Sequence, residues 1–290
     1  MKIINVLFAL LLSLDYIAAN SPITENEFQK SRLFKYAKKL DAYQQFTNLS
    51  PINCVYVINL DFREGKWNRV KSIFKKYKVF PTRFSAVEGF DLSLELQNEL
   101  TGNALDRFSP GQIGCFLSHL SVWRHAYENN LDYIWVCEDD ILAVKSMKLL
   151  PKYIQELNQL DPDWDVFYTD MDQKVNGAPL RPEGIHLSAE RMDEYDYFSK
   201  KLERRPFSDK LLIMGMRLGT TSYILSKKGI EKFIRHFLPR KMDGALDADI
   251  HHIRELREYC PTCDIVTNWS DGNTYDTNRS DKDQKFLPYL

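Results

Sequence analysis

The sequence predicts an α/β fold with a mostly parallel central sheet flanked by helices, and two observations support this prediction. Residues 54–60 and residues 133–137 are short apolar runs, typical of strands buried on both faces. An amphipathic helix follows the first run, and a second strand-like run comes after it at residues 80–87. Strand, helix and strand in that order favour parallel pairing through a right-handed crossover.

The composition fits one large folded domain. The chain has 290 residues, of which 44% are hydrophobic and 27% charged, which is the balance of a globular protein. Its net charge of −1 gives no basic field for a nucleic acid, so no nucleic-acid partner is expected. We place the domain at residues 51–268, between an N-terminal arm or helix at residues 20–50 and a C-terminal tail at residues 269–290.

The first residues have the pattern of a secretory signal peptide. Residues 1–19 contain a lysine, an apolar run from Ile3 to Leu14 and two closing alanines. The run is too short to span a bilayer comfortably, so export is expected and a short membrane anchor is the alternative. Residues 27–46 predict a helix rich in lysine and aromatic residues, for which a membrane-surface contact stays open.

Helical periodicity defines most of the remaining elements. The best-defined helix begins at Pro110, because Ser109 and Gln112 make a capping box around a proline at the first helical position; it ends at Asn129. Residues 171–209 show no period and are expected to form a functional loop. The other expected elements are helices at residues 67–77, 147–160, 227–237 and 246–258 and strands at residues 164–169, 211–216 and 220–225.

Three consecutive carboxylates, Glu138, Asp139 and Asp140, directly follow the apolar run of residues 133–137. The carboxyl end of a buried strand opens onto the ligand-binding edge of an α/β sheet, so these acids are candidates for a cation site. Side chains alternate along a strand, so Glu138 and Asp140 point the same way and can hold one hard divalent ion, Mn²⁺ or Mg²⁺. Asp139 points back. A solvated acidic turn is the alternative interpretation.

The cysteines fit an exported protein only loosely. Three of the five lie in apolar strand or helix segments and are expected to be buried thiols. Cys260 and Cys263 suit a local disulfide in an oxidising compartment. With His251 and His252 they also offer four zinc ligands, but the spacing matches no familiar zinc module.

Four motifs follow one another along the chain. They are Val-Tyr-Val-Ile-Asn-Leu-Asp at residues 55–61, Arg-Phe-Ser-Ala-Val-Glu-Gly at 83–89, Pro-Gly-Gln-Ile-Gly-Cys-Phe-Leu-Ser-His at 110–119 followed by the three acids, and Gly-Thr-Thr-Ser-Tyr-Ile-Leu-Ser at 219–226 followed by Met242-Asp243. Together they resemble glycosyltransferase family 25, which contains bacterial lipooligosaccharide galactosyltransferases and collagen galactosyltransferases. The resemblance implies a GT-A type nucleotide-sugar transferase fold, a nucleoside-diphosphate-sugar donor such as a UDP-sugar, and inversion at the anomeric carbon.

The resemblance also implies roles for the matching residues. Glu138 and Asp140 would hold the divalent ion against the donor diphosphate. Asp243 is the first candidate for the catalytic base, Asp247 is the second, and Asp249 is a further alternative. The expected donor-binding residues are Asn59, Leu60, Arg63, Arg69, Ser118, His119 and Asp139.

Simpler interpretations remain for three of these donor-binding residues. Asn59 also fits a strand-terminal turn, Arg69 a solvent-facing helix charge, and His119 a buried structural residue.

The expected activity is transfer of a hexose, galactose or glucose, to a hydroxyl of a glycan, lipooligosaccharide or protein acceptor. Two other classes stay open. A metal-dependent phosphoesterase would use the same acids with His119 or His251, although such sites usually gather more histidines and acids than this sequence offers. A non-catalytic carbohydrate-binding relative is the other, and the presence of Glu138, Asp140 and Asp243 argues against it.

Overall fold

The computed structural model describes residues 21–40, 43, 47–171, 174–175, 178–179, 204–215, 217, 219–253 and 255–269. The expected signal peptide, most of the C-terminal tail and most of the irregular segment 171–209 lie outside the described residues. Within the described ranges, no helix combines the length and the apolar character that crossing a bilayer requires.

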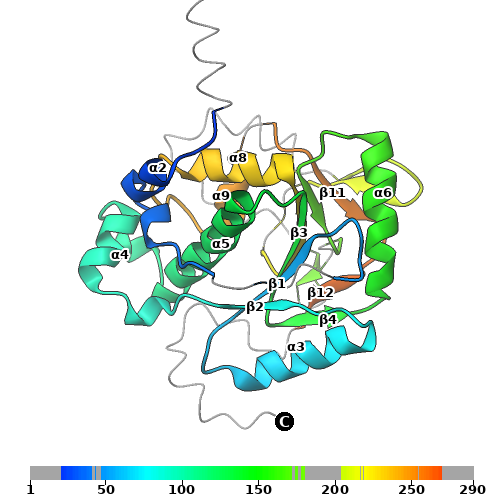
Figure 1. Ribbon diagram of the computed structural model, residues 1–290, viewed down its shortest axis with the longest axis horizontal. Helices are drawn as coiled ribbons and strands as arrows, with labels where there is room; N and C mark the ends of the chain where they lie inside the picture. Colours follow the sequence, from blue (N-terminus) through cyan, green and yellow to red (C-terminus); the bar gives the residue numbers. More distant parts are fainter. Residues whose placement is uncertain are drawn as a thin grey trace, which may run out of the picture.

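A mixed sheet of eight strands forms the centre of the described part of the chain (Figure 1). Its strands are β1 (Cys54–Asn59), β2 (Thr82–Ser85), β3 (Tyr133–Glu138), β5 (Val166–Tyr168), β8 (Arg205–Pro206), β9 (Leu211–Ile213), β10 (Ser222–Ser226) and β11 (Glu258–Pro261). Their spatial order is β2-β1-β3-β10-β5-β11-β9-β8. Strands β9 and β10 run against the other six, so the predicted α/β fold with a mostly parallel sheet is confirmed.

Helices cover both faces of this sheet (Figure 1). Helices α5 (Pro110–Glu128) and α8 (Lys227–Phe237) lie on one face, and α3 (Glu64–Lys76) and α6 (Leu150–Leu160) lie on the other. Alternate residues of β1 separate the two cores: Tyr56 packs in the core of α5, and Val57 in the core of α3. Burial on both faces explains why β1 and β3 are almost continuously apolar.

Short elements complete the described fold. They are β4 (Ile141–Ala143), which pairs with β12 (Val266–Asn268), the hairpin of β6 (Lys174–Val175) and β7 (Ala178–Pro179), helices α2 (Glu25–Lys30), α4 (Leu94–Thr101) and α9 (Leu246–Ile250), and 3₁₀ turns η1 (Phe34–Tyr36), η2 (Gly89–Asp91), η3 (Leu105–Arg107) and η4 (Met147–Leu149).

The N-terminal helix prediction is wrong in extent. The helix expected over residues 27–46 is α2, which ends at Lys30, and η1 follows. Ser31 leaves the helix in an extended conformation, and its hydroxyl accepts the Phe34 N–H at 3.2 Å. Serine side chains compete with the helix for backbone N–H groups in this way, which ends α2 and turns Phe34 into the core.

The last predicted helix is also too long. The helix expected over residues 246–258 ends at Ile250, and Glu255 adopts a left-handed φ of 56°. Glu258 and Tyr259 then pair in parallel with Val166 and Phe167. Strand pairing with β5 overrides the local helical preference, a choice that depends on tertiary context.

The two proposals for Cys260 and Cys263 are not supported by the structure. Both are free thiols, and Cys260 is buried in β11. Among the described residues, no three of Cys260, Cys263, His251 and His252 bring ligand atoms together.

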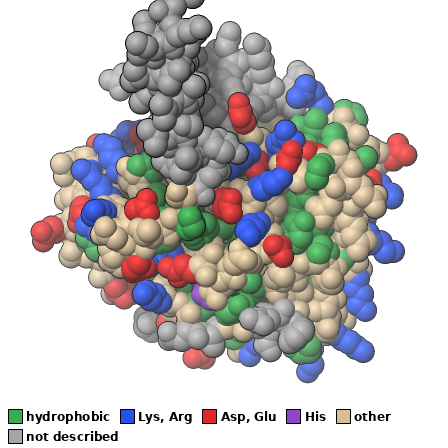
Figure 2. Space-filling model, turned by 45° about the horizontal axis from the view of Figure 1, so that its top comes forward, with side chains coloured by type: hydrophobic (Ala, Val, Ile, Leu, Met, Phe, Trp, Pro, Cys, Tyr) green, Lys and Arg blue, Asp and Glu red, His purple; other side chains and the backbone are tan. Residues whose placement is uncertain are grey.

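The surface carries charges of both signs. Figure 2 shows one face on which Lys and Arg side chains alternate with Asp and Glu side chains instead of gathering by sign. This distribution matches the net charge of −1 and gives no single-sign field on that face.

Candidate active site

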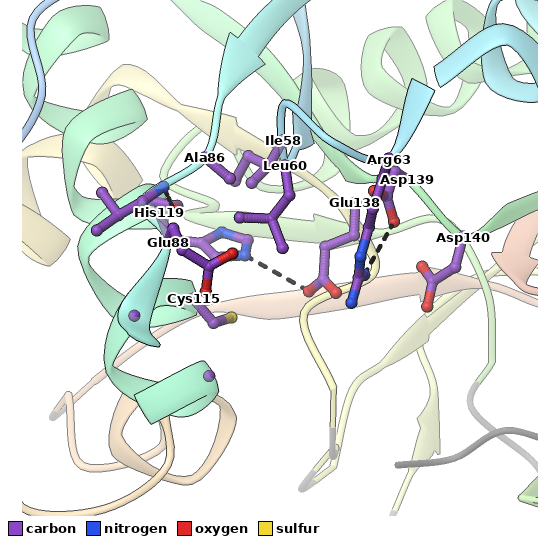
Figure 3. A pocket seen from close by; sticks show the side chains of 14 residues that line it. Ile58, Leu60, Arg63, Ala86, Glu88, Cys115, His119, Glu138, Asp139 and Asp140 are labelled. Carbon is purple, nitrogen blue, oxygen red and sulfur yellow. Dashed lines mark hydrogen bonds and ion pairs between the residues drawn. The ribbon is translucent and has the colours of Figure 1, made fainter. Parts of the chain in front are cut away.

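A pocket of about 110 Å³ lies beyond the carboxyl ends of β1 and β3 (Figure 3). Ligands of α/β proteins bind beyond this edge of the sheet. Seven of the residues predicted for the site line it: Leu60, Arg63, Ser118, His119, Glu138, Asp139 and Asp140.

Two glycines bring one wall of the pocket close to α5. A Cβ atom on Gly114 would lie 2.5 Å from the Val87 carbonyl oxygen, and one on Gly89 would lie 1.7 Å from that of Pro110. Ser118 fastens the same contact, because its hydroxyl accepts the Val87 N–H at 2.8 Å and donates to the Gly114 carbonyl at 2.7 Å. The hydroxyl of Ser118 therefore holds the pocket wall in place.

A chain of polar contacts fixes Glu138 at the end of β3. Its Oε1 accepts the Thr220 hydroxyl at 2.7 Å and lies 3.4 Å from His119 Nε2. His119 Nδ1 lies 2.7 Å from the Tyr223 hydroxyl, which also accepts Trp123 Nε1–H at 2.9 Å. Since Trp123 can only donate, the Tyr223 hydroxyl is free to give its own proton to Nδ1, which directs Nε2–H of His119 toward Glu138.

These contacts keep Glu138 ionised. Burial alone would raise the pKa of this carboxyl, but the polar contacts from His119 and Thr220 outweigh burial and lower it. The side chain is 28% exposed, so the ionised oxygens still face the pocket. A carboxylate in this state is available to a cation.

Asp139 turns away from its two neighbours. Its Oδ2 accepts the Asn59 amide at 2.8 Å, and its Oδ1 lies 3.9 Å from Arg63 Nη1 and 3.8 Å from Lys66 Nζ. Burial raises the pKa of Asp139, and the two cations and the Asn59 amide offset part of this effect. Asn59 is 1% exposed and also accepts Arg83 Nε–H at 2.8 Å. Asn59 thus ties the end of β1 to the acidic turn.

The chain that follows the acids is fixed from outside the pocket. The Asp140 carbonyl accepts the Trp269 N–H at 2.6 Å. Arg69, predicted as a donor-binding residue, stacks over the Trp269 ring at 3.9 Å and donates to the Ile141 carbonyl at 2.9 Å. Arg69 is not among the residues that line the pocket. The Asp140 carboxylate itself opens into the same space as that of Glu138 (Figure 3).

The structure separates the candidates for the catalytic base. Asp247 Oδ2 accepts the Gly219 N–H at 2.7 Å, which places this carboxylate next to the loop that carries Thr220. Asp249 is 4% exposed and accepts the N–H groups of Asp243 and Gly244 at 3.2 Å each. Asp249 therefore stabilises the turn before α9, and Asp243 lies in that turn.

Cys115 lies in the pocket wall, where Glu138 is the nearest of the acids. Burial is the main cause that raises the pKa of its thiol, and the negative charges of Glu138, Asp247 and Asp140 raise it further. Sequence reasoning assigned Cys115 only to the buried thiols, although its spacing of four residues from His119 on one helix could have identified it.

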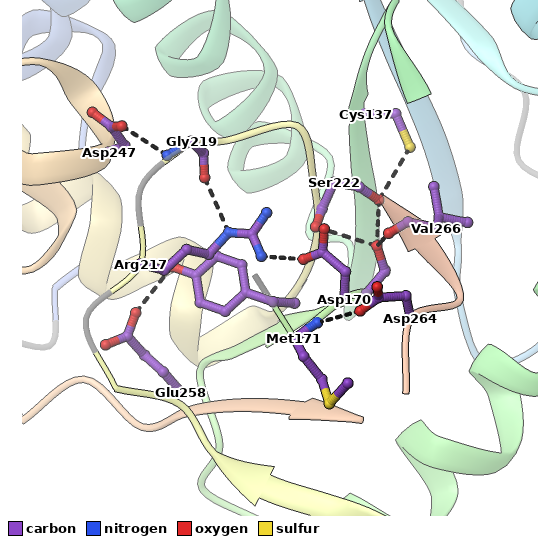
Figure 4. Close-up of polar contacts among 12 residues, drawn as sticks. Cys137, Asp170, Met171, Arg217, Gly219, Ser222, Asp247, Glu258, Asp264 and Val266 are labelled. Carbon is purple, nitrogen blue, oxygen red and sulfur yellow. Dashed lines mark hydrogen bonds and ion pairs between the residues drawn. The ribbon is translucent and has the colours of Figure 1, made fainter. Parts of the chain in front are cut away.

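A buried ion pair that sequence reasoning missed supports the loop before β10 (Figure 4). Asp170 and Arg217 are paired, and each side chain is 4% exposed. Arg217 Nε donates to the Gly219 carbonyl at 3.1 Å, and His251 Nε2 lies 2.6 Å from the Arg217 carbonyl oxygen and 3.0 Å from the Arg217 backbone nitrogen. The only indication in the sequence is that Asp170, like Glu138, directly follows a strand.

The donor chemistry of the pocket fits a hard divalent ion. Glu138 and Asp140 offer carboxylate oxygens, the ligands that Mn²⁺ and Mg²⁺ prefer, and the pocket leaves room for further oxygen ligands.

A family model described as "Glycosyltransferase family 25 (LPS biosynthesis protein)" matches residues 52–248. The chain belongs to this family. The match confirms the family that the sequence motifs indicated, and the sheet with its flanking helices agrees with the expected GT-A-like α/β fold.

Several curated relatives are similar to part of this chain. Procollagen galactosyltransferase 2 of Homo sapiens is 29% identical over 124 residues, which are 39% of this chain and 20% of that protein. Procollagen galactosyltransferase 1 of Danio rerio is 24% identical over 227 residues, 73% of this chain and 34% of that protein. A glycosyltransferase 25 family member of Drosophila melanogaster is 29% identical over 118 residues, 38% of this chain and 19% of that protein. The chain thus spans only about a fifth to a third of the length of these relatives.

Proposed function

We propose that this protein is an inverting, metal-dependent galactosyltransferase that moves galactose from UDP-galactose to an acceptor hydroxyl. The observation that carries the proposal is the joint position of Glu138 and Asp140 in one pocket at the sheet edge, in a chain of glycosyltransferase family 25. Galactose is favoured over glucose because relatives matched here are named procollagen galactosyltransferases.

Glu138 and Asp140 would hold Mn²⁺ or Mg²⁺. A divalent ion there supplies neutralising charge for the departing diphosphate. Arg63, which lines the same pocket, adds a fixed positive charge on the donor side. Asn59, through Asp139, keeps the acidic turn in register with β1. The protein therefore orients the donor with residues from the ends of β1 and β3.

The acceptor hydroxyl needs a base on the face opposite the leaving diphosphate. Asp247 is favoured, because its carboxylate lies beside Gly219 and contributes to the field at Cys115 in the pocket wall. Asp243 is the second candidate. Replacing each by Asn should separate them: we expect Asp247→Asn to lower kcat at least 100-fold, and Asp243→Asn to lower it less than 10-fold. The reverse order would move the base to Asp243.

The test of the whole proposal is release of UDP from UDP-galactose with Mn²⁺ present. Asp140→Asn should lose at least roughly 100-fold of this activity, since it removes one of two metal ligands. Asp163→Asn, a change at an exposed ion pair far from the pocket, is the matched control. Full activity in the presence of a strong chelator would refute metal dependence.

Two other outcomes would replace the proposal. Release of phosphate from simple esters without sugar transfer would indicate a phosphoesterase. Binding without turnover would indicate a carbohydrate-binding relative, and a thermal-shift measurement detects it: a ligand at 100 times its Kd adds about 2.7 kcal/mol of apparent stability.

We also propose a compartment and an acceptor for this activity. Residues 1–19 have the pattern of a secretory signal peptide, so we place the protein in the secretory pathway. An acceptor panel of a collagen-like peptide, a glycan and a lipooligosaccharide would identify the hydroxyl used. The expected result is transfer to the peptide, by analogy with the named function of the relatives.

A further inference from the structure

Three side chains with different ligand chemistry meet at the inner wall of the pocket. The Cys115 sulfur, a ring nitrogen of His119 and a carboxylate oxygen of Glu138 all lie within 4.8 Å of one another. Figure 3 shows them converging from α5 and from the end of β3. Among the described residues, this is the one group of three or more His, Cys, Asp or Glu side chains that converges in this way.

The local structure is suited to hold an ion between these side chains. Cys115 and His119 are four residues apart on α5, so they lie one above the other on the same helix face. His119 is fully buried, and its Nε2 makes no hydrogen bond of normal geometry within the described residues. Its other ring nitrogen contacts the Tyr223 hydroxyl at 2.7 Å, which fixes the orientation of the ring.

We propose that Cys115, His119 and Glu138 form a zinc site in the pocket wall. A tetrahedral site with three protein ligands and an open fourth position is the usual arrangement of accessible zinc sites, and the pocket supplies that fourth position to water or an anionic ligand. Zinc bonds of about 2.0–2.3 Å place neighbouring ligand atoms about 3.3–3.7 Å apart. His119 Nε2 already lies 3.4 Å from Glu138 Oε1, so closure by about 1 Å is sufficient, and rotation of the Cys115 and Glu138 side chains supplies it.

The ligand set selects zinc over the ions expected for sugar transfer. Thiolate and imidazole favour Zn²⁺ over Mn²⁺ and Mg²⁺, whereas paired carboxylates favour the harder ions. Binding displaces the Cys115 thiol proton to solvent. The ring proton of His119 moves from Nε2 to Nδ1, where the Tyr223 hydroxyl accepts it with its second lone pair.

The site shares Glu138 with the proposed Mn²⁺ site. Zinc binding itself does not depend on the proposed function. The expected effect of zinc on sugar transfer rests on that function. With Glu138 bound to zinc, the donor metal keeps only Asp140, so zinc is expected to inhibit transfer in competition with Mn²⁺. The pocket would then respond to two metals in opposite ways.

The test is a titration of the metal-free full-length protein with Co²⁺, a spectroscopic substitute for zinc. A thiolate-to-cobalt charge-transfer band that Zn²⁺ abolishes is expected from the wild type. Cys115→Ser should lose the band, and its zinc affinity should fall by more than the roughly 10- to 100-fold that outer partners of metal sites contribute. Cys263→Ser is the matched control, since that sulfur faces Tyr153 at 3.8 Å and should leave both measurements unchanged.

A second measurement needs no variant to fold. Zinc X-ray absorption on the wild type should show one sulfur at about 2.3 Å together with lighter ligands.

Tyr223→Phe should weaken zinc binding roughly 10- to 100-fold, because it removes the partner that orients the His119 ring. A first shell of nitrogen and oxygen alone, or a cobalt band that survives Cys115→Ser, would overturn the site.

Failure of this proposal and failure of the proposed function are distinguishable. Asp140→Asn should abolish transfer and leave the cobalt band in place. A cobalt band in an enzyme that lacks transferase activity would retain the zinc site and refute the transferase. Transfer with Mn²⁺ in a protein without a cobalt band would support the transferase and refute the zinc site.

Discussion

The buried ion pair of Asp170 and Arg217 allows a quantitative test of how the active-site loop is supported. Asp170→Asn keeps the shape of the side chain but removes its charge, so a guanidinium that is 4% exposed loses its carboxylate partner. Breaking a buried pair from one side costs about 3–5 kcal/mol. The Tyr168 ring lies 4.7 Å from this guanidinium in both proteins, so its cation–π contact does not change the difference between them. We therefore expect a loss of about 3–5 kcal/mol in the free energy of unfolding.

Urea unfolding followed by tryptophan fluorescence measures this loss, because Trp123, Trp135 and Trp164 are buried in the core. Asp163→Asn is the matched control: its partner Lys228 is 57% exposed and Asp163 is 53% exposed. Exposed pairs contribute at most about 1 kcal/mol, so the control should differ little from the wild type. Equal slopes against urea would show that the two variants unfold from comparable native states.

The same variant should also affect the site. Arg217 Nε holds the Gly219 carbonyl, and the next residue, Thr220, holds Glu138. If the protein turns over UDP-galactose as proposed, Asp170→Asn is therefore expected to lower this turnover in the fraction that remains folded. If Asp170→Asn and Asp163→Asn differ by less than about 1 kcal/mol, the pair is not desolvated in solution and this reasoning fails.

Three further predictions concern packing, protonation and the loop. Gly114→Ala should destabilise the protein by about 1–3 kcal/mol in urea unfolding, since its Cβ would lie 2.5 Å from the Val87 carbonyl, whereas Gly244→Ala meets nothing closer than 3.5 Å and should change little. Burial and two neighbouring basic residues lower the pKa of His236 to about 4. Because the unfolded chain binds this proton more readily than the folded one, neutral His236 contributes its full share to the free energy of unfolding above about pH 6.5, and this share is lost as the pH falls toward 4. His236→Gln should therefore reduce the fall of the unfolding free energy between these pH values by on the order of 2 kcal/mol. The same pH dependence in His236→Gln and the wild type would contradict this prediction. Thr220→Val should lower the proposed UDP-galactose turnover about 10-fold or more, because it removes one hydrogen bond to Glu138 at the end of β3. Thermal unfolding checks that the variant folds.

The sequence by itself determined the features that depend on neighbouring residues. The capping box predicted at the start of the long helix is present: the Ser109 hydroxyl accepts the Gln112 N–H at 3.2 Å, and Gln112 Oε1 accepts the Ser109 N–H at 2.9 Å. The apolar run before Glu138 is β3, because burial on both faces requires such a run. Each of these rules acts within a few residues, so the order of residues along the chain is sufficient.

Only the tertiary structure decided how these pieces meet. The Asn59 amide and the Asp139 carboxylate are 80 positions apart, and their bond exists because β1 and β3 are neighbours in the sheet. The helix expected over residues 246–258 ends at Ile250, and Glu258 instead begins the strand beside β5. The placement of Asp247 beside Gly219, 28 positions away, likewise depends on the packing of α9 near β10.

The physical reason is the range of the interactions. Hydrogen bonds of caps and the periodicity of apolar residues are local, so they can be predicted from sequence. Burial, strand partners and the field of distant charges depend on residues that the fold brings together, as it does Cys115 and Glu138 in one pocket wall. The sequence shows that suitable residue types are present, and the packing of α5 against the sheet brings them together in one site.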